Sequence, residues 1–180
     1  FTRSPPILEN GRIKRRKPLS QEEIMEFKKP IGPLTTHCII HSELATFPLS
    51  FRDKKLKNLC FRAGFPKDFE DKIKFLIEIG LASEEPIDIK GVRVKPRDVL
   101  VKVIDSLPIP KDRAKELEDL KVELIGRKKG KKKIIKLDCI VKSKKGWEEY
   151  GSDIDTGMPI SIAAQMIAKG LIKESGVLAP

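Results

Sequence analysis

The amino-acid sequence predicts an α+β fold: a mixed β-sheet with helices packed on one of its faces. Two observations support this class. Strand-like segments outnumber helical segments, and the helices lie between short ribbons and do not alternate strictly with single strands. With 180 residues, the chain is long enough for one domain with its own core, or at most one and a half.

A β-ribbon is predicted at the start of the chain. The dipeptide Asn10-Gly11 favours the left-handed backbone of a tight hairpin turn, and short apolar segments flank it. The two strands of the ribbon are expected near residues 6–9 and 12–16. We therefore interpret residues 1–20 as a ribbon and linker, and residues 21–180 as the main domain.

The next segments have weaker signals. Ser20 and Glu23 have the spacing of a capping box, so residues 22–27 are either a short helix or an extended segment. Further strands are expected at residues 36–40 and 56–61. Between them, a brief helical or irregular stretch is expected to end at Pro48.

Two helices have clear signals. The first begins at Pro66, whose ring favours a first helical turn, and ends at Gly80. The second begins at Pro96 and ends before Pro108, and a ribbon or extended segment at residues 87–94 precedes it. The apolar side chains of the first helix recur on one face, at Phe69, Ile73, Leu76 and Ile77.

The C-terminal third of the chain has the clearest strand signature. Residues 122–125 and 133–141 are expected to form a long hairpin around a lysine-rich turn. The polar residues 108–120 are expected to form a loop and a surface helix. A mostly apolar segment that begins near Pro159 and ends at Gly170 predicts a largely buried helix.

The net charge of +11 is a property that many nucleic-acid-binding proteins share. The densest basic block, Arg127–Lys133, is however typical of a solvated hairpin tip. Only 6% of the residues are aromatic, so the chain offers no obvious platform for stacking bases, and we do not expect a nucleic-acid partner. No apolar run approaches the ~18–20 residues of a membrane-spanning helix, so no membrane partner is expected either.

Cysteine and histidine spacing predicts no metal site. Cys38, Cys60 and Cys139 lack C-x-x-C spacing, which disfavours both a disulfide scaffold and a cysteine-based zinc site, and reduced thiols favour the cytoplasm. His37 and His41 would share a strand face, but at ~13 Å they are too far apart for one ion.

Familiar catalytic motifs are missing from the sequence. It contains no glycine fingerprint of a dinucleotide-binding fold, no phosphate-binding loop and no serine elbow. No catalytic acid or base can be assigned from spacing. The titratable side chains that deserve inspection are Asp155, His37 and His41.

Three stretches resemble the saccharopine dehydrogenase-like family, which includes saccharopine reductase and lysine 6-dehydrogenase. They follow the order of the family and together cover most of residues 20–180. The stretches are Glu22 to Phe51 with its run His41-Ser-Glu-Leu-Ala-Thr-Phe-Pro, Leu59-Cys-Phe-Arg-Ala-Gly-Phe65 with the helix up to Gly80-Leu81, and Asp155-Thr-Gly-Met-Pro onward to Gly176-Val-Leu.

This resemblance implies that cofactor binding and substrate binding belong to two different domains. Family members bind NAD or NADP on a Rossmann domain, while a second domain shapes the amino-acid pocket and forms a homodimer. The chain resembles that second domain, with the fold of the C-terminal domain of glyceraldehyde-3-phosphate dehydrogenase and without the cofactor half. The implied role is to bind an amino acid whose C–N bond the intact enzyme oxidises or reduces; the chain alone is expected to be inactive.

The resemblance also implies a substrate site at Arg62, Gly64 and Phe65. A guanidinium can hold a substrate carboxylate through two hydrogen bonds, and glycine gives the backbone freedom for a turn and for a close ligand. The alternatives are an arginine paired with an acid such as Asp68, and a glycine that serves the turn alone.

A second implied group is Asp155, Thr156, Gly157 and Pro159, which would lie near the cofactor. Free N–H groups at a helix start suit an anion, although ordinary capping by Asp155 or Thr156 explains the same residues. Many relatives carry Thr or Arg where this chain has Asp153 and Asp155, so the charge of the substrate stays open.

Two other interpretations remain. The chain could be a stand-alone basic module that binds nucleic acid or a protein partner, or a relative that keeps only dimerisation. The oxidoreductase interpretation predicts a longer parent chain with a glycine fingerprint upstream. The module interpretation predicts salt-sensitive binding to nucleic acid.

Overall fold

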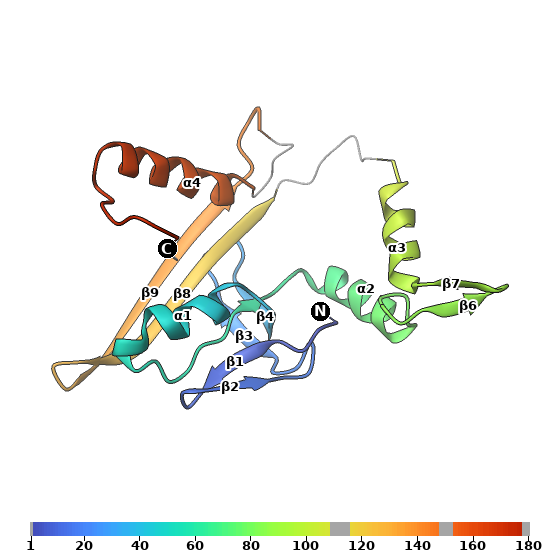
Figure 1. Ribbon diagram of the computed structural model, residues 1–180, viewed down its shortest axis with the longest axis horizontal. Helices are drawn as coiled ribbons and strands as arrows, with labels where there is room; N and C mark the ends of the chain where they lie inside the picture. The colour runs from blue at the N-terminus through green and yellow to red at the C-terminus, as the bar shows by residue number, and fades with distance from the viewer. Residues whose placement is uncertain (1, 109–115, 148–152, 178–180) are drawn as a thin grey trace. The chain divides into compact units, whose positions relative to one another are not determined.

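The computed structural model describes residues 2–108, 116–147 and 153–177. The chain divides into two compact units. Unit 1 comprises Phe1–Met25 and Leu34–Ile109, and unit 2 comprises Glu26–Pro33 and Pro110–Pro180. Figure 1 shows the helices and strands in chain order, and each unit is described here by itself.

The predicted N-terminal ribbon is confirmed. Strands β1 (Pro6–Glu9) and β2 (Arg12–Arg15) pair antiparallel in unit 1. Asn10 and Gly11 adopt φ values of 52° and 76°, the left-handed conformations that this two-residue turn requires.

The next sheet has the order β3-β4-β5, formed by Glu23–Glu26, Pro33–Cys38 and Arg62–Ala63. Of the two alternatives for residues 22–27, the extended one is therefore correct. The strand expected at residues 56–61 is wrong for most of that segment. Leu59 exchanges backbone hydrogen bonds of 2.9 and 3.0 Å with Leu8, so this stretch runs against the ribbon, and regular pairing with β4 begins only at Arg62.

The helices of unit 1 follow the sequence closely. Helix α2 (Lys67–Glu78) begins directly after Pro66, and α3 (Pro96–Asp105) begins at its proline, with the hairpin of β6 (Ile87–Ile89) and β7 (Val92–Val94) before it. Helix α1 (Glu43–Ser50) is followed by the short 3-10 helix η1 (Arg52–Lys54). The expected stop at Pro48 is wrong, because a proline in a last helical turn removes only one backbone donor.

The core of unit 1 is small and partly polar. Its most buried apolar residues are Ile7, Leu8, Cys38 and Leu44. Strand β4 is buried on both faces, since Thr36 and His37 are 1% and 0% exposed. The ring of His37 lies between two oxygen acceptors: Nδ1 is 3.2 Å from the carbonyl of Leu19, and Nε2 is 3.3 Å from the carboxylate of Glu70 on α2.

The surroundings of His37 orient its ring. A carbonyl oxygen only accepts, so Nδ1 of His37 donates to Leu19, and Nε2 faces the carboxylate of Glu70. His37 is therefore a buried, hydrogen-bonded link between β4 and α2.

Replacing Glu70 by alanine should destabilise the protein, because His37 would keep a buried nitrogen without a partner. We expect the free energy of unfolding to fall by about 1–3 kcal/mol, measured by urea denaturation. The matched variant Glu70→Gln should stay close to wild type, since its amide can donate to Nε2. Equal losses in both variants would contradict the hydrogen-bond role.

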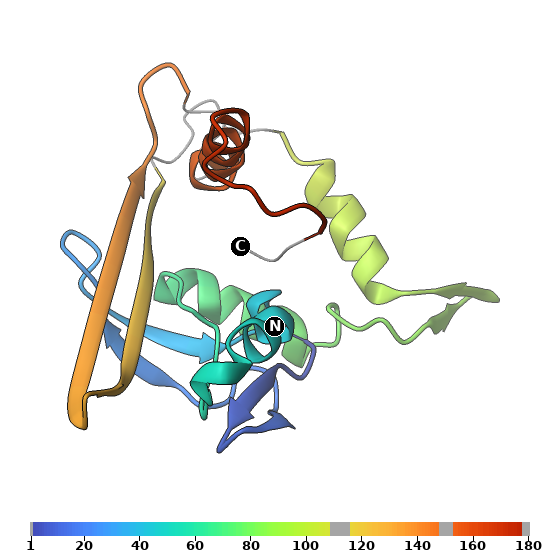
Figure 2. The same ribbon diagram turned by 60° about the vertical axis from the view of Figure 1, so that its left-hand side comes forward.

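Unit 2 contains the long predicted hairpin. Strands β8 (Leu117–Lys128) and β9 (Lys131–Lys142) pair antiparallel along their whole length, as Figure 2 also shows. The surface helix expected within residues 108–120 is wrong for Leu117–Leu120, which belong to β8; residues 109–115 lie outside the described part. The sequence Leu-Glu-Asp-Leu of this segment does not alternate between apolar and polar residues, but the pairing with β9 extends over it, from Leu117 opposite Lys142 to Leu120 opposite Cys139.

The final helix α4 (Asp153–Ala168) differs from expectation in two ways. It begins at Asp153, so Pro159 lies inside it, whereas the sequence predicted a start near Pro159. It is also exposed where burial was expected: Ile160 is 69% and Ile162 is 49% exposed. Apolar side chains lie on more than one side of this helix, and several of them are exposed.

The α+β class is confirmed, but the single mixed sheet is not what the described residues form. They form four small sheets, of two, three, two and two strands. Three of the sheets are hairpins with two-residue turns, which join neighbours in sequence antiparallel, whereas parallel pairs need long crossovers. Among the described residues, no helix combines the length and the apolar character needed to cross a bilayer.

Candidate functional site

Arg62 occupies the first position of β5, directly opposite Cys38 of β4. Its Nη1 donates to the carbonyl oxygen of Gln21 at 2.9 Å and to that of Thr36 at 3.3 Å. Its Nη2 lies 2.8 Å from a carboxylate oxygen of Glu23. The guanidinium is thus held in place by two backbone carbonyls and already binds a carboxylate.

The partner of Arg62 is Glu23 and not the helix acid Asp68 that the sequence suggested, because β3 brings Glu23 to the same sheet. The two side chains differ in exposure. That of Arg62 is only 16% exposed, whereas that of Glu23 is 58% exposed. An anion from solution could therefore replace Glu23 while Arg62 keeps its backbone contacts.

Gly64 follows β5, and its neighbours explain why the residue is glycine. A Cβ atom there would lie 2.5 Å from the carbonyl oxygen of Thr35 and 3.0 Å from side-chain atoms of Leu34 and Thr36. The backbone of Gly64 thus runs directly against β4. Gly64 has no positive φ, so close packing, rather than an unusual backbone angle, requires glycine here.

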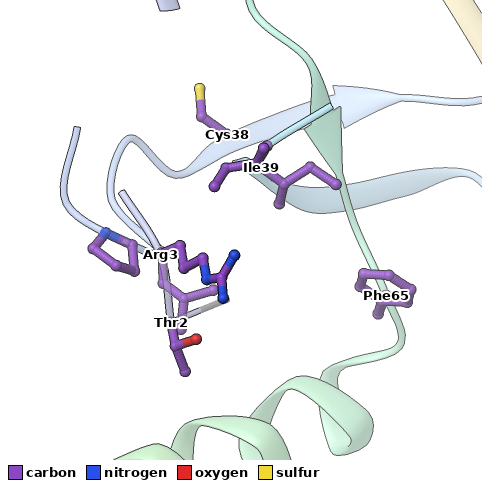
Figure 3. A pocket seen from close by; sticks show the side chains of 8 residues that line it. Thr2, Arg3, Cys38, Ile39 and Phe65 are labelled. Atoms are coloured by element: carbon purple, nitrogen blue, oxygen red, sulfur yellow. The ribbon is translucent and has the colours of Figure 1, made fainter. Parts of the chain in front are cut away.

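A pocket of about 340 Å³ lies in unit 1 beside Phe65. Its volume falls in the lower part of the range typical of small-molecule sites. Figure 3 shows Arg3 and Thr2 near each other, with Phe65 on another side of the pocket. The lining residues are Thr2, Arg3, Pro18, Leu19, Cys38, Ile39, Ile40 and Phe65.

The lining combines an apolar wall with one guanidinium, that of Arg3. Arg3 donates to Glu84 at 3.0 Å, and Arg97 binds the same carboxylate oxygen. Hydrogen bonding from Arg3 and its charge, together with the charge of Arg97, lower the pKa of Glu84 below its usual value. Sequence reasoning missed Thr2 and Arg3, because a position so close to the start of the chain carries no signal for a pocket.

The second predicted group lies in α4 of unit 2. Asp155, Thr156, Gly157 and Pro159 all fall inside the helix, so they do not precede its start as the sequence suggested. The free N–H groups belong to the first turn, which also carries Asp153 and Asp155. Of the first predicted group, Phe65 lines the pocket of unit 1, whereas Arg62 and Gly64 are not among its lining residues. The second group belongs to a separate unit.

The titratable candidates differ in their surroundings. His37 is the fully buried partner of Glu70. His41 is half-exposed; it contacts Glu43, and its ring stacks on Phe61 with centroids 3.8 Å apart. Asp155 accepts a hydrogen bond of 3.4 Å from Thr156. Among the described residues, no three His, Cys, Asp or Glu side chains gather as a metal site would require.

Comparison with known families places the chain in a family. The sequence matches the family described as the saccharopine dehydrogenase C-terminal domain over residues 1–180. The match thus covers both compact units, together with the pocket and Arg62.

Proposed function

Because the chain belongs to the saccharopine dehydrogenase C-terminal domain family, and is thus a domain of an amino-acid dehydrogenase, we propose that it binds the amino-acid substrate of an NAD(P)-dependent oxidoreductase. The reaction would transfer a hydride between the nicotinamide and the C–N bond of the amino acid. The observation that carries this proposal is Arg62, whose oriented guanidinium holds a carboxylate that solvent can reach.

In this proposal the substrate carboxylate takes the place of Glu23 on Arg62. The two backbone carbonyls that bind Nη1 keep the guanidinium oriented, so little conformational freedom is lost when an anion binds. Gly64 keeps the chain after Arg62 close to β4, and Phe65 supplies part of an apolar wall. In this proposal Arg62 binds the carboxylate of the amino acid, and Phe65, three residues further on, contacts its hydrocarbon part.

The first turn of α4 does not suit the phosphates of NAD or NADP. The first turn of α4 carries the carboxylates of Asp153 and Asp155, which would repel a pyrophosphate. The same charges would suit a positively charged group, such as the amine of the substrate. We therefore propose that a nucleotide-binding domain outside these 180 residues holds the cofactor, with Asp155, Thr156, Gly157 and Pro159 near its reactive end.

Isothermal titration calorimetry with two kinds of ligand tests the proposal. The first kind is a panel of amino acids, namely saccharopine, lysine and glutamate, and the second is a duplex DNA and a single-stranded RNA at low and moderate salt. Saturable binding of an amino acid supports the substrate role. Salt-sensitive binding of nucleic acid without binding of any amino acid would favour the basic-module interpretation and overturn the proposal.

We also propose that the protein forms a homodimer through one face of the β8–β9 hairpin. Side chains alternate along each strand, so the register places six apolar residues on one face: Leu120, Val122, Leu124, Ile135, Leu137 and Cys139. The opposite face carries an ion-pair network, in which Lys121 contacts Asp138 at 3.2 Å and Lys136 contacts Glu123 at 2.8 Å. The apolar face is exposed, with Leu137 at 57% and Leu124 at 51%. A second copy would cover it.

Leu137→Asp should convert the dimer to a monomer, because it places a charge in the centre of the apolar face. Multi-angle light scattering should give about twice 20.3 kDa for wild type and about 20.3 kDa for the variant. The control is Lys136→Gln, one residue away on the opposite face, which should remain dimeric. A monomeric wild type, or equal effects of both variants, would argue against this interface.

A further inference from the structure

We propose that Cys38 and Cys60 are a redox-active dithiol, which an oxidant of the peroxide class converts into an intramolecular disulfide. This inference does not rest on the proposed substrate role. Both cysteines lie in unit 1, whereas Cys139 belongs to β9 of unit 2.

The register of the sheet places the two thiols on one face. Cys38 pairs directly with Arg62, and Cys60 precedes Arg62 by two residues, so its side chain points to the same side. The hydrogen bond of 3.0 Å from the amide of Ile39 to the carbonyl oxygen of Phe61 continues the antiparallel pairing beyond β5. Cys60 is thus a diagonal neighbour of Cys38 on the same face of the sheet.

Exposure distinguishes the two cysteines. Cys38 is 3% exposed, and its Sγ lies 3.6 Å from the side-chain oxygen of Gln21. Cys60 is exposed to solvent. An oxidant in solution therefore reaches the exposed Cys60 before the nearly buried Cys38.

The groups around Cys38 and Cys60 decide which of the two cysteines is the nucleophile. Hydrogen bonding from Cys38, supported by the guanidinium of Arg62, lowers the pKa of Cys60 to about 6, although burial and Glu23 act in the opposite direction. The hydrogen bond with Cys60 and burial raise the pKa of Cys38. At neutral pH Cys60 is therefore the thiolate, which is the nucleophilic form, and Cys38 is the protonated partner.

The chemistry balances with hydrogen peroxide as the oxidant. The Cys60 thiolate attacks one peroxide oxygen, the O–O bond breaks, and the products are a sulfenic acid and hydroxide, which takes up a proton to become water. Sγ of Cys38 then attacks the sulfenic sulfur; the S–S bond forms, and the hydroxyl leaves as water with the proton of the Cys38 thiol. Two thiols lose two electrons in total, and one peroxide is reduced to two waters.

Closing the disulfide requires a small movement of the chain. Diagonal neighbours in a sheet have Cα atoms about 7–8 Å apart, whereas a disulfide needs less than about 7 Å. Cys60 lies just outside β5, between Leu59, which is hydrogen-bonded to Leu8, and Phe61, which accepts from Ile39, so this segment has to shift locally before Cys60 reaches Cys38. The bond would also remove the thiolate beside Arg62 and tie down a residue that lines the pocket.

Peptide mass mapping of the peroxide-treated protein tests this inference. Remaining thiols are blocked with N-ethylmaleimide, and the digest is compared with an untreated sample. We expect one label, on Cys139, and a linked peptide pair joining Cys38 to Cys60 with a mass about 2 Da below the sum of its parts. Dithiothreitol should restore three labels.

Three serine variants complete the test. Cys139→Ser should still form the disulfide, whereas Cys60→Ser, an exposed and structurally mild change, should form none and leave Cys38 unoxidised. Cys38→Ser should accumulate a sulfenic acid on Cys60 that dimedone traps. Any one of three results would overturn the inference, whatever the amino-acid titrations show. These are three labels on the treated wild type, a disulfide that involves Cys139, and oxidation of Cys38 in the Cys60→Ser variant.

Discussion

Replacing Arg62 by methionine is expected to weaken binding of the amino-acid substrate by about 10- to 150-fold. This factor corresponds to losing hydrogen bonds to a charged group, which contribute about 1.5–3 kcal/mol. The apolar side chain keeps much of the volume of arginine but provides no donor for the carboxylate. Calorimetric dissociation constants for wild type and variant measure the effect, and circular dichroism shows whether the variant is folded.

Glu23→Gln is the sharper companion experiment, because it changes the competitor and leaves Arg62 intact. If the substrate carboxylate replaces Glu23, removing the charge of Glu23 should tighten binding by up to about fivefold, since an exposed ion pair contributes about 0–1 kcal/mol. The control is Glu22→Gln, the neighbouring acid, which lies 3.4 Å from Lys74 and should change nothing. Weaker binding in Glu23→Gln would show that the carboxylate does not bind Arg62 in this way.

A second large effect is expected at Gly64, where any side chain meets the backbone of β4. Gly64→Ala should lower the free energy of unfolding by about 1–3 kcal/mol, and Gly64→Val by more, because the carbonyl oxygen of Thr35 lies only 2.5 Å from the added Cβ. The midpoint of urea denaturation should fall with little change in slope.

The control for Gly64 is Gly126→Ala in β8. Gly126 also lies in extended structure, but a Cβ there would meet nothing within 4 Å. Alanine should therefore be neutral or slightly stabilising, since glycine costs about 0.5–1 kcal/mol in a strand. Equal midpoint shifts in both variants would show that the close approach of Gly64 to β4 is not the reason why this position requires glycine.

The sequence predicts well where a local signal decides the structure. Asn10-Gly11 specifies its turn by the left-handed angles that both residues adopt, and Pro66 and Pro96 mark helix starts because each lacks a donor that the first turn does not need. The same reasoning fails at Pro159. There the acidic residues Asp153 and Asp155 begin the helix, and the proline is tolerated inside it.

Long-range contacts limit the prediction of the site. Arg62 was identified by resemblance, but its pairing with Glu23 depends on the sheet order β3-β4-β5, which no local pattern contains. Arg3 lines the pocket only because the chain folds back from a distant position. Cys38 and Cys60 lie on one face of the sheet for the same reason, since the register between strands, rather than spacing along the sequence, makes them neighbours.

The most direct test of the central claim is to locate the bound amino acid by NMR. Backbone amide shifts of the ¹⁵N-labelled protein are followed during titration with saccharopine. If the chain binds the substrate as proposed, the saturating shift changes should centre on Arg62, Gly64, Phe65 and the neighbouring residues of β4. Shift changes confined to the basic turn between β8 and β9, or no saturating change in the presence of millimolar ligand, would contradict the account.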